Sequence, residues 1–280
     1  MNFQEIAINR RQFINRASKI AGFGLAASVL GPRLLQAAPT PAIFYSPHAD
    51  DEAIGMAGAM QEQKAAGRPV YLVLLTDGVN PALLDIMNGA TRCKWHRTHH
   101  RFNLTMEQMM WARKIEFIAS ARQLQVDKLF ILNDGRGWDD REPYTDYNGF
   151  VSRIIGAIKH FEQQFPGAAH RLASGFLDAS PEGGRNPTHR ACWDAALMLR
   201  PNIADFRFYR VYVYYAEPAK RQAQSRLRLK NSWQAVKQRS LAEYQLFIPA
   251  ANRYALGYHS VPKLMDNAAG DIYEYFDLLP

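Results

Sequence analysis

Four side chains that can bind a metal or carry a proton lie within five consecutive positions of the sequence. His48, Asp50, Asp51 and Glu52 directly follow the apolar run 42–45. Two adjacent carboxylates in a half-buried turn repel each other, and a divalent cation would neutralise them and give the imidazole a partner. This spacing predicts the site of a metal-dependent hydrolase. The alternative is a helix start whose acids only cap free N–H groups, but capping does not account for the histidine.

A hydrolytic zinc site holds three protein ligands and leaves a fourth position for water. His48 and Asp51 supply two ligands, so a third must come from a distant loop at the same edge of a sheet. The best candidate is His189, which follows the Gly-rich turn 183–187 at the predicted start of a helix. The alternative for His189 is an exposed position in the first helical turn, outside any site.

The elements that must position these residues alternate between strand and helix. The run 70–76 has hardly a polar residue, which is typical of a strand covered on both faces. The alternation predicts an α/β fold, a Rossmann-like three-layer sandwich with a mostly parallel sheet. The tail 241–280 lacks a clear period and is interpreted as an extension of the same domain. Strands are predicted at 43–46, 70–76, 128–132, 171–176 and 206–215, and helices at 52–66, 106–125, 150–165 and 188–199.

Acidic residues follow three of the predicted strands. Asp50 and Asp51 come after the first strand, Asp77 after the second and Asp134 after the third. Because the carboxyl ends of parallel strands share one edge of the sheet, a binding pocket is expected there.

The loop 79–105 is long for a compact domain, and it contains His96, His99 and His100. Long loops at the functional edge often form lids or walls of a pocket. The three histidines could bind a second metal, but no acidic residue lies among them. Solvent exposure is therefore the favoured interpretation.

Four motifs of the sequence occur in the order of one known family. The run 47–52, Pro-His-Ala-Asp-Asp-Glu, resembles the His-Pro-Asp-Asp-Glu signature of the LmbE-like, or PIG-L, family of zinc-dependent N-deacetylases. The run 186–189 resembles that family's second motif, commonly His-x-x-His. Arg113 and Glu116 match its Arg-x-x-Glu helix, and 133–135 match the loop after its third strand. The shared order of the four motifs makes the resemblance specific.

The resemblance implies one zinc ion per chain. His48, Asp51 and His189 are implied to bind it, and Asp50 is implied to be the general base. Zinc lowers the pKa of a bound water towards ~7 and polarises a carbonyl, so that water can attack an amide at neutral pH.

Two further residues are implied to bind the substrate. Arg113 of the Arg-x-x-Glu helix and Asp134 after the third strand match family positions near the sugar pocket. The alternatives are an ion pair within the helix for Arg113 and a turn position for Asp134.

The sequence departs from the family pattern at two positions. Ala49 replaces the usual proline, which removes no functional group. Asn186 stands where the family commonly has a histidine that stabilises the oxyanion or protonates the leaving group. An amide can donate a hydrogen bond to an oxyanion, but it cannot deliver a proton. Either Asp50 handles both proton transfers, or another group does, or the protein is slow or inactive.

The N-terminal segment 1–38 has the layout of a twin-arginine signal. Arg10 and Arg11 are paired, Phe13 follows two positions later, and the apolar stretch 20–31 is too short and too rich in Gly and Ala to favour a membrane anchor. The sequence thus predicts a signal peptide, 1–38, recognised by the twin-arginine export machinery. A deacetylase domain, 39–280, is expected in the periplasm or secreted.

Net charge and cysteine content narrow the class of partner. Removal of 1–38, with five basic and one acidic residue, lowers the formal net charge from +8 to +4. Nucleic acid is not expected as a partner of an exported protein of this charge. The basic stretch 220–239 is interpreted as a solvated helix face. Cys93 and Cys192 are too few for a disulfide scaffold, and whether they pair is left open, as is the oligomeric state.

Together these features predict a zinc-dependent enzyme that hydrolyses the N-acetyl group of an amino sugar, in an extracytoplasmic glycan or glycoconjugate. The first alternative is an amidase that cuts another acyl amide. The second is a carbohydrate-binding protein that holds a metal without turnover.

Overall fold

The structure is a computed structural model that describes the chain except residues 1–3, 7–38, 79, 133–138, 175–185 and 279–280. Its centre is an eight-stranded sheet in the order β1-β4-β3-β2-β5-β6-β10-β7. The strands are β1 (Gln4–Ile6), β2 (Ala42–Ser46), β3 (Val70–Leu74), β4 (Lys128–Ile131), β5 (Ala169–Ala173), β6 (Phe206–Tyr209), β7 (Ser225–Arg228) and β10 (Tyr273–Leu278).

The five strands from β4 to β6 are parallel, and the outer strands β1, β10 and β7 pair antiparallel. β2, β3 and β5 are buried along their whole length, because helices cover both faces. The predicted α/β fold with a mostly parallel sheet is therefore confirmed. The chain winds outward from β2 through β3 to β4 and then returns to pair β5 with β2. This reversal of strand order is where α/β sheets place ligands.

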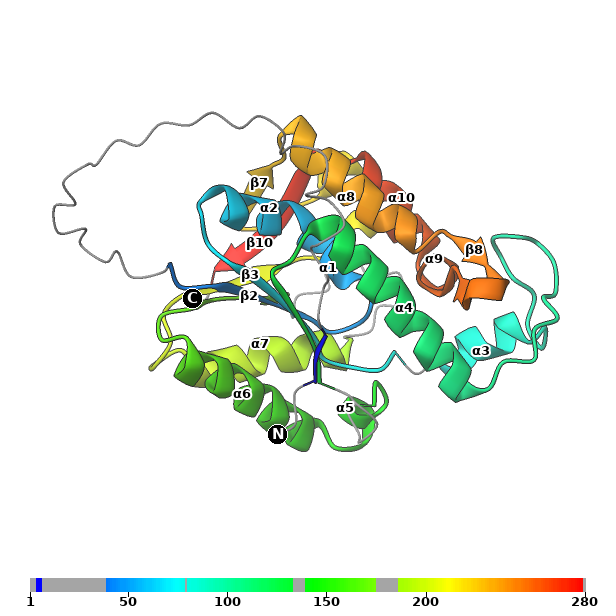
Figure 1. Ribbon diagram of the computed structural model, residues 1–280, viewed down its shortest axis with the longest axis horizontal. Coiled ribbons are helices and arrows are strands. Elements are labelled where there is room, and N and C mark those ends of the chain that lie inside the picture. The colour runs from blue at the N-terminus through cyan, green and yellow to red at the C-terminus, as the bar shows by residue number, and fades with distance from the viewer. Residues whose placement is uncertain (1–3, 7–38, 79, 133–138, 175–185, 279–280) are drawn as a thin grey trace, which may run out of the picture.

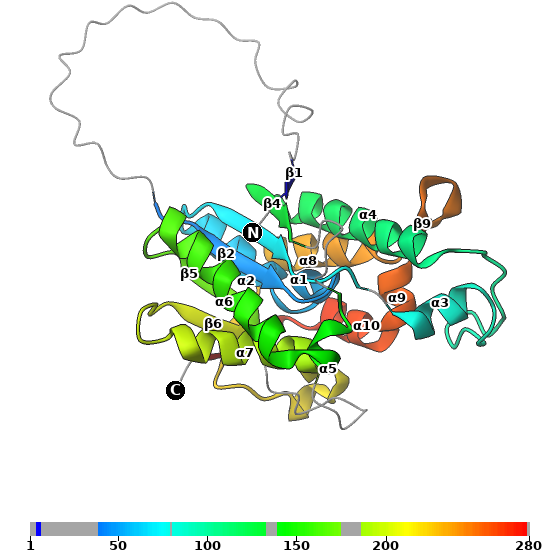
Figure 2. The ribbon, with the colours of Figure 1, turned by 90° about the horizontal axis from the view of Figure 1, so that it is seen from below.

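Two layers of helices cover the sheet (Figures 1 and 2). One layer holds α1 (Asp51–Gly55), α2 (Ala57–Ala65), α4 (Met106–Leu124), α8 (Asn231–Glu243) and α10 (Pro262–Gly270). The opposite layer holds α6 (Tyr147–Gln164) and α7 (Pro187–Leu199). Each layer packs on the sheet through its own buried hydrophobic cluster. The smaller helices are α3 (Pro81–Met87), α5 (Glu142–Thr145), α9 (Leu256–Ser260) and the 3-10 turns η2 (Tyr212–Tyr215), η3 (Pro218–Lys220) and η4 (Pro249–Ala251); β8 (Phe247–Ile248) and β9 (Arg253–Tyr254) form a hairpin.

The helix predicted at 52–66 is divided into α1 and α2 at Met56. The carboxylate of Glu274, from the distant strand β10, accepts hydrogen bonds from the backbone N–H groups of Gly58 and Ala59 at 2.8 and 2.9 Å. Glu274 thereby satisfies the free donors at the start of α2, which a local sequence pattern cannot reveal.

One prediction for the C-terminal part was wrong. The strand expected at 206–215 ends at Tyr209, and the chain turns into η2 before it reaches the pocket. The tail 241–280, whose sequence lacks a clear period, forms regular elements, including α10, which begins at Pro262, and β10, which joins the main sheet. The alternation of β10 was missed because both of its faces are largely covered.

The basic stretch 220–239 is also not a single solvated helix face. It spans β7 and most of α8, and Lys237 is fully buried. Its ammonium lies 3.2 Å from the carboxylate of Glu274, which is also fully buried.

The N-terminal segment is described only at Gln4–Ile6, which pairs antiparallel with the edge strand β4. Arg10, Arg11 and the rest of the expected export signal lie outside the described residues. Among the helices of the described chain, none combines the length and the apolar character needed to cross a membrane. Cys93 and Cys192 are both buried free thiols.

Candidate metal centre and active-site pocket

The turn after β2 is held from beneath by a buried carboxylate. Glu52, fully buried, accepts hydrogen bonds from the backbone N–H of Asp50 at 3.1 Å and from the hydroxyls of Ser120 and Tyr244 at 2.6 Å each. The hydroxyl of Thr76 donates to the carbonyl of Pro47 at 2.7 Å. The last acid of the signature motif therefore fixes the turn and does not face the pocket.

Three donor atoms converge at the end of β2. The distances are 3.1 Å from His48 Nδ1 to Asp51 Oδ2, 3.3 Å from His189 Nε2 to Asp51 Oδ2, and 3.2 Å between the two imidazole nitrogens. Ligands of a tetrahedral zinc ion lie about 3.3 Å apart, given metal–ligand distances near 2.0–2.2 Å. The donor set predicted from the sequence thus has the spacing of one face of a metal tetrahedron.

The electrostatics of this triad favour a cation. Burial alone would raise the pKa of the Asp51 carboxyl, but the imidazoles of His189 and His48 hold it well below its usual range. Burial would lower the pKa of His48, yet the carboxylates of Asp140 and Asp51 raise it well above its usual value. Positive charge is therefore stabilised between these carboxylates, which suits a divalent ion.

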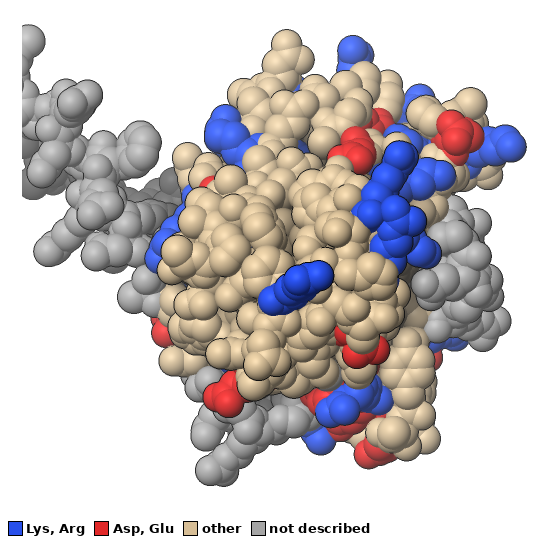
Figure 3. Space-filling model, turned by 90° about the vertical axis from the view of Figure 1, so that its right-hand side faces the viewer, with Lys and Arg blue, Asp and Glu red and all other residues tan. Residues whose placement is uncertain are grey.

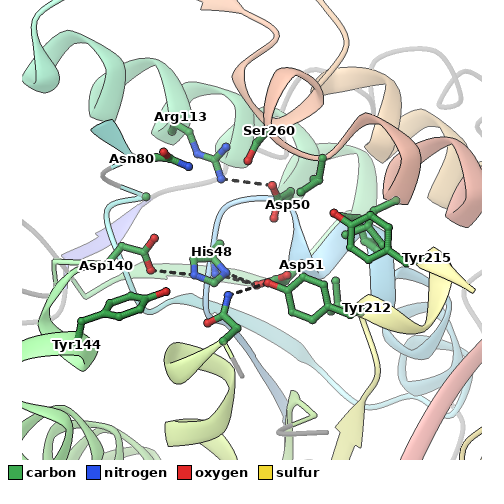
Figure 4. A pocket seen from close by; sticks show the side chains of 16 residues that line it. His48, Asp50, Asp51, Asn80, Arg113, Asp140, Tyr144, Tyr212, Tyr215 and Ser260 are labelled. Atoms are coloured by element: carbon green, nitrogen blue, oxygen red, sulfur yellow. Dashed lines mark hydrogen bonds and ion pairs between the residues drawn. The ribbon is translucent and has the colours of Figure 1, made fainter. Parts of the chain in front are cut away.

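Asp140 orients His48 and is not among the residues predicted from the sequence. Its Oδ1 lies 2.8 Å from His48 Nε2 and accepts a hydrogen bond from the Thr188 hydroxyl at 3.2 Å (Figure 4). The Asp140 backbone N–H donates to Asp77 Oδ1 at 3.4 Å. A carboxylate on the far nitrogen of a ligand histidine fixes the ring and raises its basicity. Its only sequence signal was a second adjacent pair of acids, 139–140, after the third strand.

Asp50 lies beside the triad and is held by Arg113. The Arg113 Nη2 donates to Asp50 Oδ2 at 3.3 Å and to the carbonyl of Ala49 at 2.8 Å (Figure 4). Burial raises the pKa of Asp50 to about 8, against the lowering effect of the Arg113 charge. The backbone of Asp50 has φ 151°, a conformation that a non-glycine residue adopts at a cost of about 1–3 kcal/mol and that clusters at functional sites.

Arg113 passes so close to the loop after β3 that only glycine fits there. Gly78 has φ +68°, and a Cβ at this position would lie 2.9 Å from Arg113 Nε. Glu116, the other half of the Arg-x-x-Glu motif, instead accepts hydrogen bonds from the backbone N–H groups of Leu256 and Gly257 at 2.7 and 3.0 Å. The two residues of the motif therefore contact different elements: Arg113 contacts the turn after β2, and Glu116 contacts α9.

Asn186 caps α7 and reaches the pocket. Its Oδ1 accepts hydrogen bonds from the backbone N–H groups of Thr188 and His189 at 3.0 and 3.4 Å, and its Nδ2 donates to the Tyr212 hydroxyl at 2.7 Å. Tyr212, on η2, also packs its ring 4.9 Å from that of His189. Tyr212 could not be recognised from the sequence, because the apolar run 206–215 is typical of one continuous strand.

Most of the polar groups described above line one cavity of about 490 Å³, namely His48, Asp50, Asp51, Arg113, Asp140, Asn186 and Tyr212. His189 is fully buried and contacts the Tyr212 ring of this wall. Asp134, the second predicted substrate-binding residue, lies outside the described residues. Besides the residues above, the walls include Asn80, Tyr144, Tyr215, Ser260 and Leu264. The cavity is of the size of small-molecule sites and is rich in polar groups.

Residues 43–199 match the protein family described as PIG-L, GlcNAc-PI de-N-acetylase. This match covers more than half of the chain and includes the turn after β2, the Arg-x-x-Glu helix and the start of α7. The chain belongs to the PIG-L family. PIG-L proteins are deacetylases, hydrolases that act on an amide. No curated protein matches the chain.

Solved structures with the same fold include three deacetylases. The zinc-inhibited form of the teicoplanin deacetylase Orf2 is 17% identical over 85% of this chain and 96% of its own, with a TM-score of 0.53. The deacetylase of the A40926 pseudoaglycone is 16% identical over 85% and 95%, with a TM-score of 0.53. The N,N'-diacetylchitobiose deacetylase from Pyrococcus horikoshii is 15% identical over 86% and 84%, with a TM-score of 0.51. At these identities the similarity establishes the fold of this PIG-L chain.

Proposed function

We propose that this PIG-L protein is a zinc-dependent N-deacetylase that removes the acetyl group from an amino sugar in an extracytoplasmic glycan or glycoconjugate. One observation carries the proposal: the donor atoms of His48, Asp51 and His189 converge, and His48 and Asp51 line a single pocket together with the neighbouring carboxylate of Asp50. A protein that only held a metal and bound a carbohydrate would need the three metal ligands, but it would not need the Asp50 carboxylate beside them.

His48, Asp51 and His189 would hold the metal, since their donor atoms lie within 4.8 Å of one another and one of them is a carboxylate. When bound, a divalent metal lowers the pKa of a water molecule and polarises the carbonyl of the scissile amide. Asp140 keeps His48 in the orientation that presents Nδ1 to the site.

Asp50 is the group that moves protons. Its carboxylate faces the pocket and is held by Arg113, and a pKa raised by burial makes it a stronger base than an exposed aspartate. It accepts the proton of the attacking water and later donates it to the leaving amine. Arg113 is thus a positioning residue for Asp50 as well as part of the pocket wall.

Tyr212 supplies the hydrogen bond that Asn186 was expected to provide. Because the Asn186 amide donates to the Tyr212 oxygen, the hydroxyl hydrogen of Tyr212 must point away from Asn186. Tyr212 lines the pocket, so this hydrogen is free to point into it. The buried phenol has a pKa raised well above its usual value, so it stays protonated. It can therefore donate to the oxyanion that forms on the amide carbonyl.

The pocket walls suit a sugar. Tyr144, Tyr212 and Tyr215 place aromatic rings that carry hydroxyl groups at the cavity, and Tyr212 and Tyr215 lie parallel with ring centroids 6.2 Å apart. Such side chains offer an apolar face and a polar tip, which match the C–H faces and hydroxyls of a pyranose. Two proteins of similar structure are the N,N'-diacetylchitobiose deacetylase and the A40926 pseudoaglycone deacetylase, and the first of these substrates supports an acetylated amino sugar.

The extracytoplasmic setting is proposed from Arg10, Arg11 and the apolar stretch that follows. Its test is the cellular fraction in which the full chain accumulates. Replacement of both arginines by lysine should retain the protein in the cytoplasm, whereas unchanged export would remove the twin-arginine route from the proposal.

The first measurement of activity is acetate release from N-acetylglucosamine oligomers by protein that has been stripped of metal with a chelator and then supplied with one or two equivalents of zinc, cobalt or manganese. A zinc excess is tested separately, because a similar deacetylase has a zinc-inhibited form. Metal-dependent release that Asp50→Asn abolishes, with metal still bound, is the expected result. A mutant as active as the wild type would remove Asp50 from the mechanism. Glycan binding without release by either protein would favour the binding-protein alternative.

A further inference from the structure

A second group of metal-binding side chains lies away from the pocket triad. Cys93, His96 and His100 come from the loop between α3 and α4, and His259 comes from α9. One donor atom of each lies within 4.8 Å of the others. His96 and His99 are exposed, as predicted from the sequence, but the prediction was wrong for His100, which is only partly exposed. Nothing in the sequence indicated that Cys93 would join these histidines or that His259 would approach the loop.

The distances between these donors fit a tetrahedral ion. Three imidazole nitrogens, His96 Nδ1, His100 Nε2 and His259 Nε2, lie 3.2 Å from one another, and Cys93 Sγ lies 3.9 Å from His96 Nδ1. In a tetrahedral zinc site two nitrogens are about 3.3 Å apart and a nitrogen and a sulfur about 3.6 Å.

Hydrogen bonds between the rings do not explain the cluster. The Nδ1 of His259 lies 2.8 Å from the carbonyl of Ala255 and donates its hydrogen there, so the neutral ring has none at Nε2. The other two rings would have to supply the hydrogens for all three nitrogen–nitrogen contacts, which they cannot do with good geometry. One cation at the centre would instead bind all three nitrogens. The Ala255 contact is also the orienting bond that a ligand histidine commonly makes.

The surroundings enclose the cluster on the side of Cys93 and Trp95. Cys93 is 2% exposed, and its sulfur accepts a hydrogen bond from the backbone N–H of His96 at 3.3 Å. The Trp95 ring stacks on His96 at 4.1 Å and packs edge-on against His259 at 4.9 Å, so it covers the cluster. Figure 3 faces this end of the molecule, where uncharged side chains dominate the surface, and exposed Phe247 and Ile248 lie on the neighbouring hairpin.

Few buried apolar side chains hold this loop in place, so a metal cross-link would stabilise it. Between Gly89 and Arg101 no regular secondary structure forms, and Cys93 is the one fully buried residue. Ordering a residue costs about 1–2 kcal/mol of backbone entropy, and this loop recovers little of that cost through apolar contacts. Metal binding by four ligands from two segments can supply the free energy that the apolar contacts do not.

We propose that Cys93, His96, His100 and His259 form a second, structural zinc site. One thiolate and three imidazoles fill all four positions, which is the arrangement of structural zinc and leaves no place for a substrate. The metal fastens the loop 88–105 to α9, and Ser260 at the end of α9 lines the catalytic pocket. The site does not depend on the proposed deacetylase activity.

Metal counting tests the proposal. The tag-free full chain is chelated, reloaded with zinc, desalted and analysed for bound metal. Two ions per chain are expected in the wild type, one in Cys93→Ala and one in His189→Ala. His99→Ala is the matched control, because His99 is in the same loop but contacts the Gly89 carbonyl at 2.9 Å, and it should keep two ions. Equal metal content in the wild type and in Cys93→Ala would overturn the proposal.

Cobalt gives a readout that separates the two sites. Among the described ligand candidates only Cys93 offers a thiolate, so a sulfur-to-cobalt charge-transfer band in the near ultraviolet reports this site alone. The band should persist in His189→Ala and disappear in Cys93→Ala. If Cys93→Ala fails to fold, His259→Cys should fold, retain metal and strengthen the band. Absence of the band from cobalt-loaded wild type would overturn the proposal, whatever the result of the acetate assay.

Trypsin tests the structural role. The loop contains four cleavage sites, at Arg92, Lys94, Arg97 and Arg101. Zinc should protect them in the wild type and in His189→Ala, and chelation should expose them. Cleavage rates in the loop that do not change with metal would show that the ion does not fasten it.

Discussion

Tyr212 and Asn186 share one hydrogen bond of 2.7 Å, and that bond decides where the tyrosine hydrogen points. Tyr212→Phe should lower kcat about 10²–10³-fold, the usual effect of losing one oxyanion donor, without loss of metal. Tyr147→Phe is the control, since its hydroxyl donates to Asp194 at 2.6 Å and does not line the pocket. A Tyr212→Phe enzyme with normal kcat would exclude the hydroxyl from the mechanism.

Two variants of Asn186 separate capping from catalysis. Asn186→Asp keeps an acceptor for the N–H groups at the start of α7 but would draw the Tyr212 hydrogen toward itself. Its kcat should fall as far as in Tyr212→Phe, with normal unfolding. Asn186→His restores the common family residue but removes the cap of α7, which should cost about 1 kcal/mol of unfolding free energy. Its kcat would rise only if the missing acid group limits turnover. Equal kcat in Asn186→Asp and the wild type would contradict the role of this bond.

Asp140 gives a prediction about metal affinity at the same scale. Asp140→Asn removes the carboxylate from His48 Nε2 and should weaken metal binding about 10–100-fold, measured by competition with a chromophoric chelator. Asp139→Asn is the neighbouring control, because Asp139 pairs with exposed Arg141. Unchanged affinity in Asp140→Asn would show that His48 is oriented without it.

At the scale of elements, α4 links the catalytic turn to α9. Glu116 accepts two backbone hydrogen bonds at the start of α9, where burial raises its pKa to about 7. Glu116→Gln leaves one N–H without an acceptor and should cost about 1–3 kcal/mol of unfolding free energy. Hydrogen exchange at the amides of Leu256 and Gly257 should accelerate, while Glu107→Gln, in the first turn of α4, should change neither. Unaltered exchange at α9 would mean that other contacts hold it.

At the scale of the whole molecule, a buried ion pair joins the C-terminal elements to the sheet. Lys237 of α8 and Glu274 of β10 are both fully buried, and Glu274 also caps α2. Glu274→Gln leaves a buried ammonium without its counter-charge and should destabilise the protein by about 3–5 kcal/mol in urea unfolding. Glu62→Gln, which breaks the partly exposed pair with Arg207 at 3.6 Å, should cost less than about 1 kcal/mol. Similar losses in the two variants would contradict this distinction.

The sequence by itself determined the parallel core and its functional edge. Strands such as 70–74 are apolar throughout because both faces are covered, and acids placed directly after them can only lie at the carboxyl edge. The ligand candidates His48, Asp51 and His189 followed from residue type, spacing and the order of motifs, and the structure places their donor atoms together.

Tertiary structure decided the contacts between distant segments. Four of these contacts join residues that are 92 to 216 positions apart in the sequence. They are Asp140 with His48, Glu116 with α9, Glu274 with α2, and His259 with the loop that contains Cys93. Local periodicity reports which face of an element is buried, but it carries no information on what covers that face. Polar partners inside a protein are chosen by the packing of whole elements, and for this reason the second metal cluster emerged only when α9 was placed against the loop.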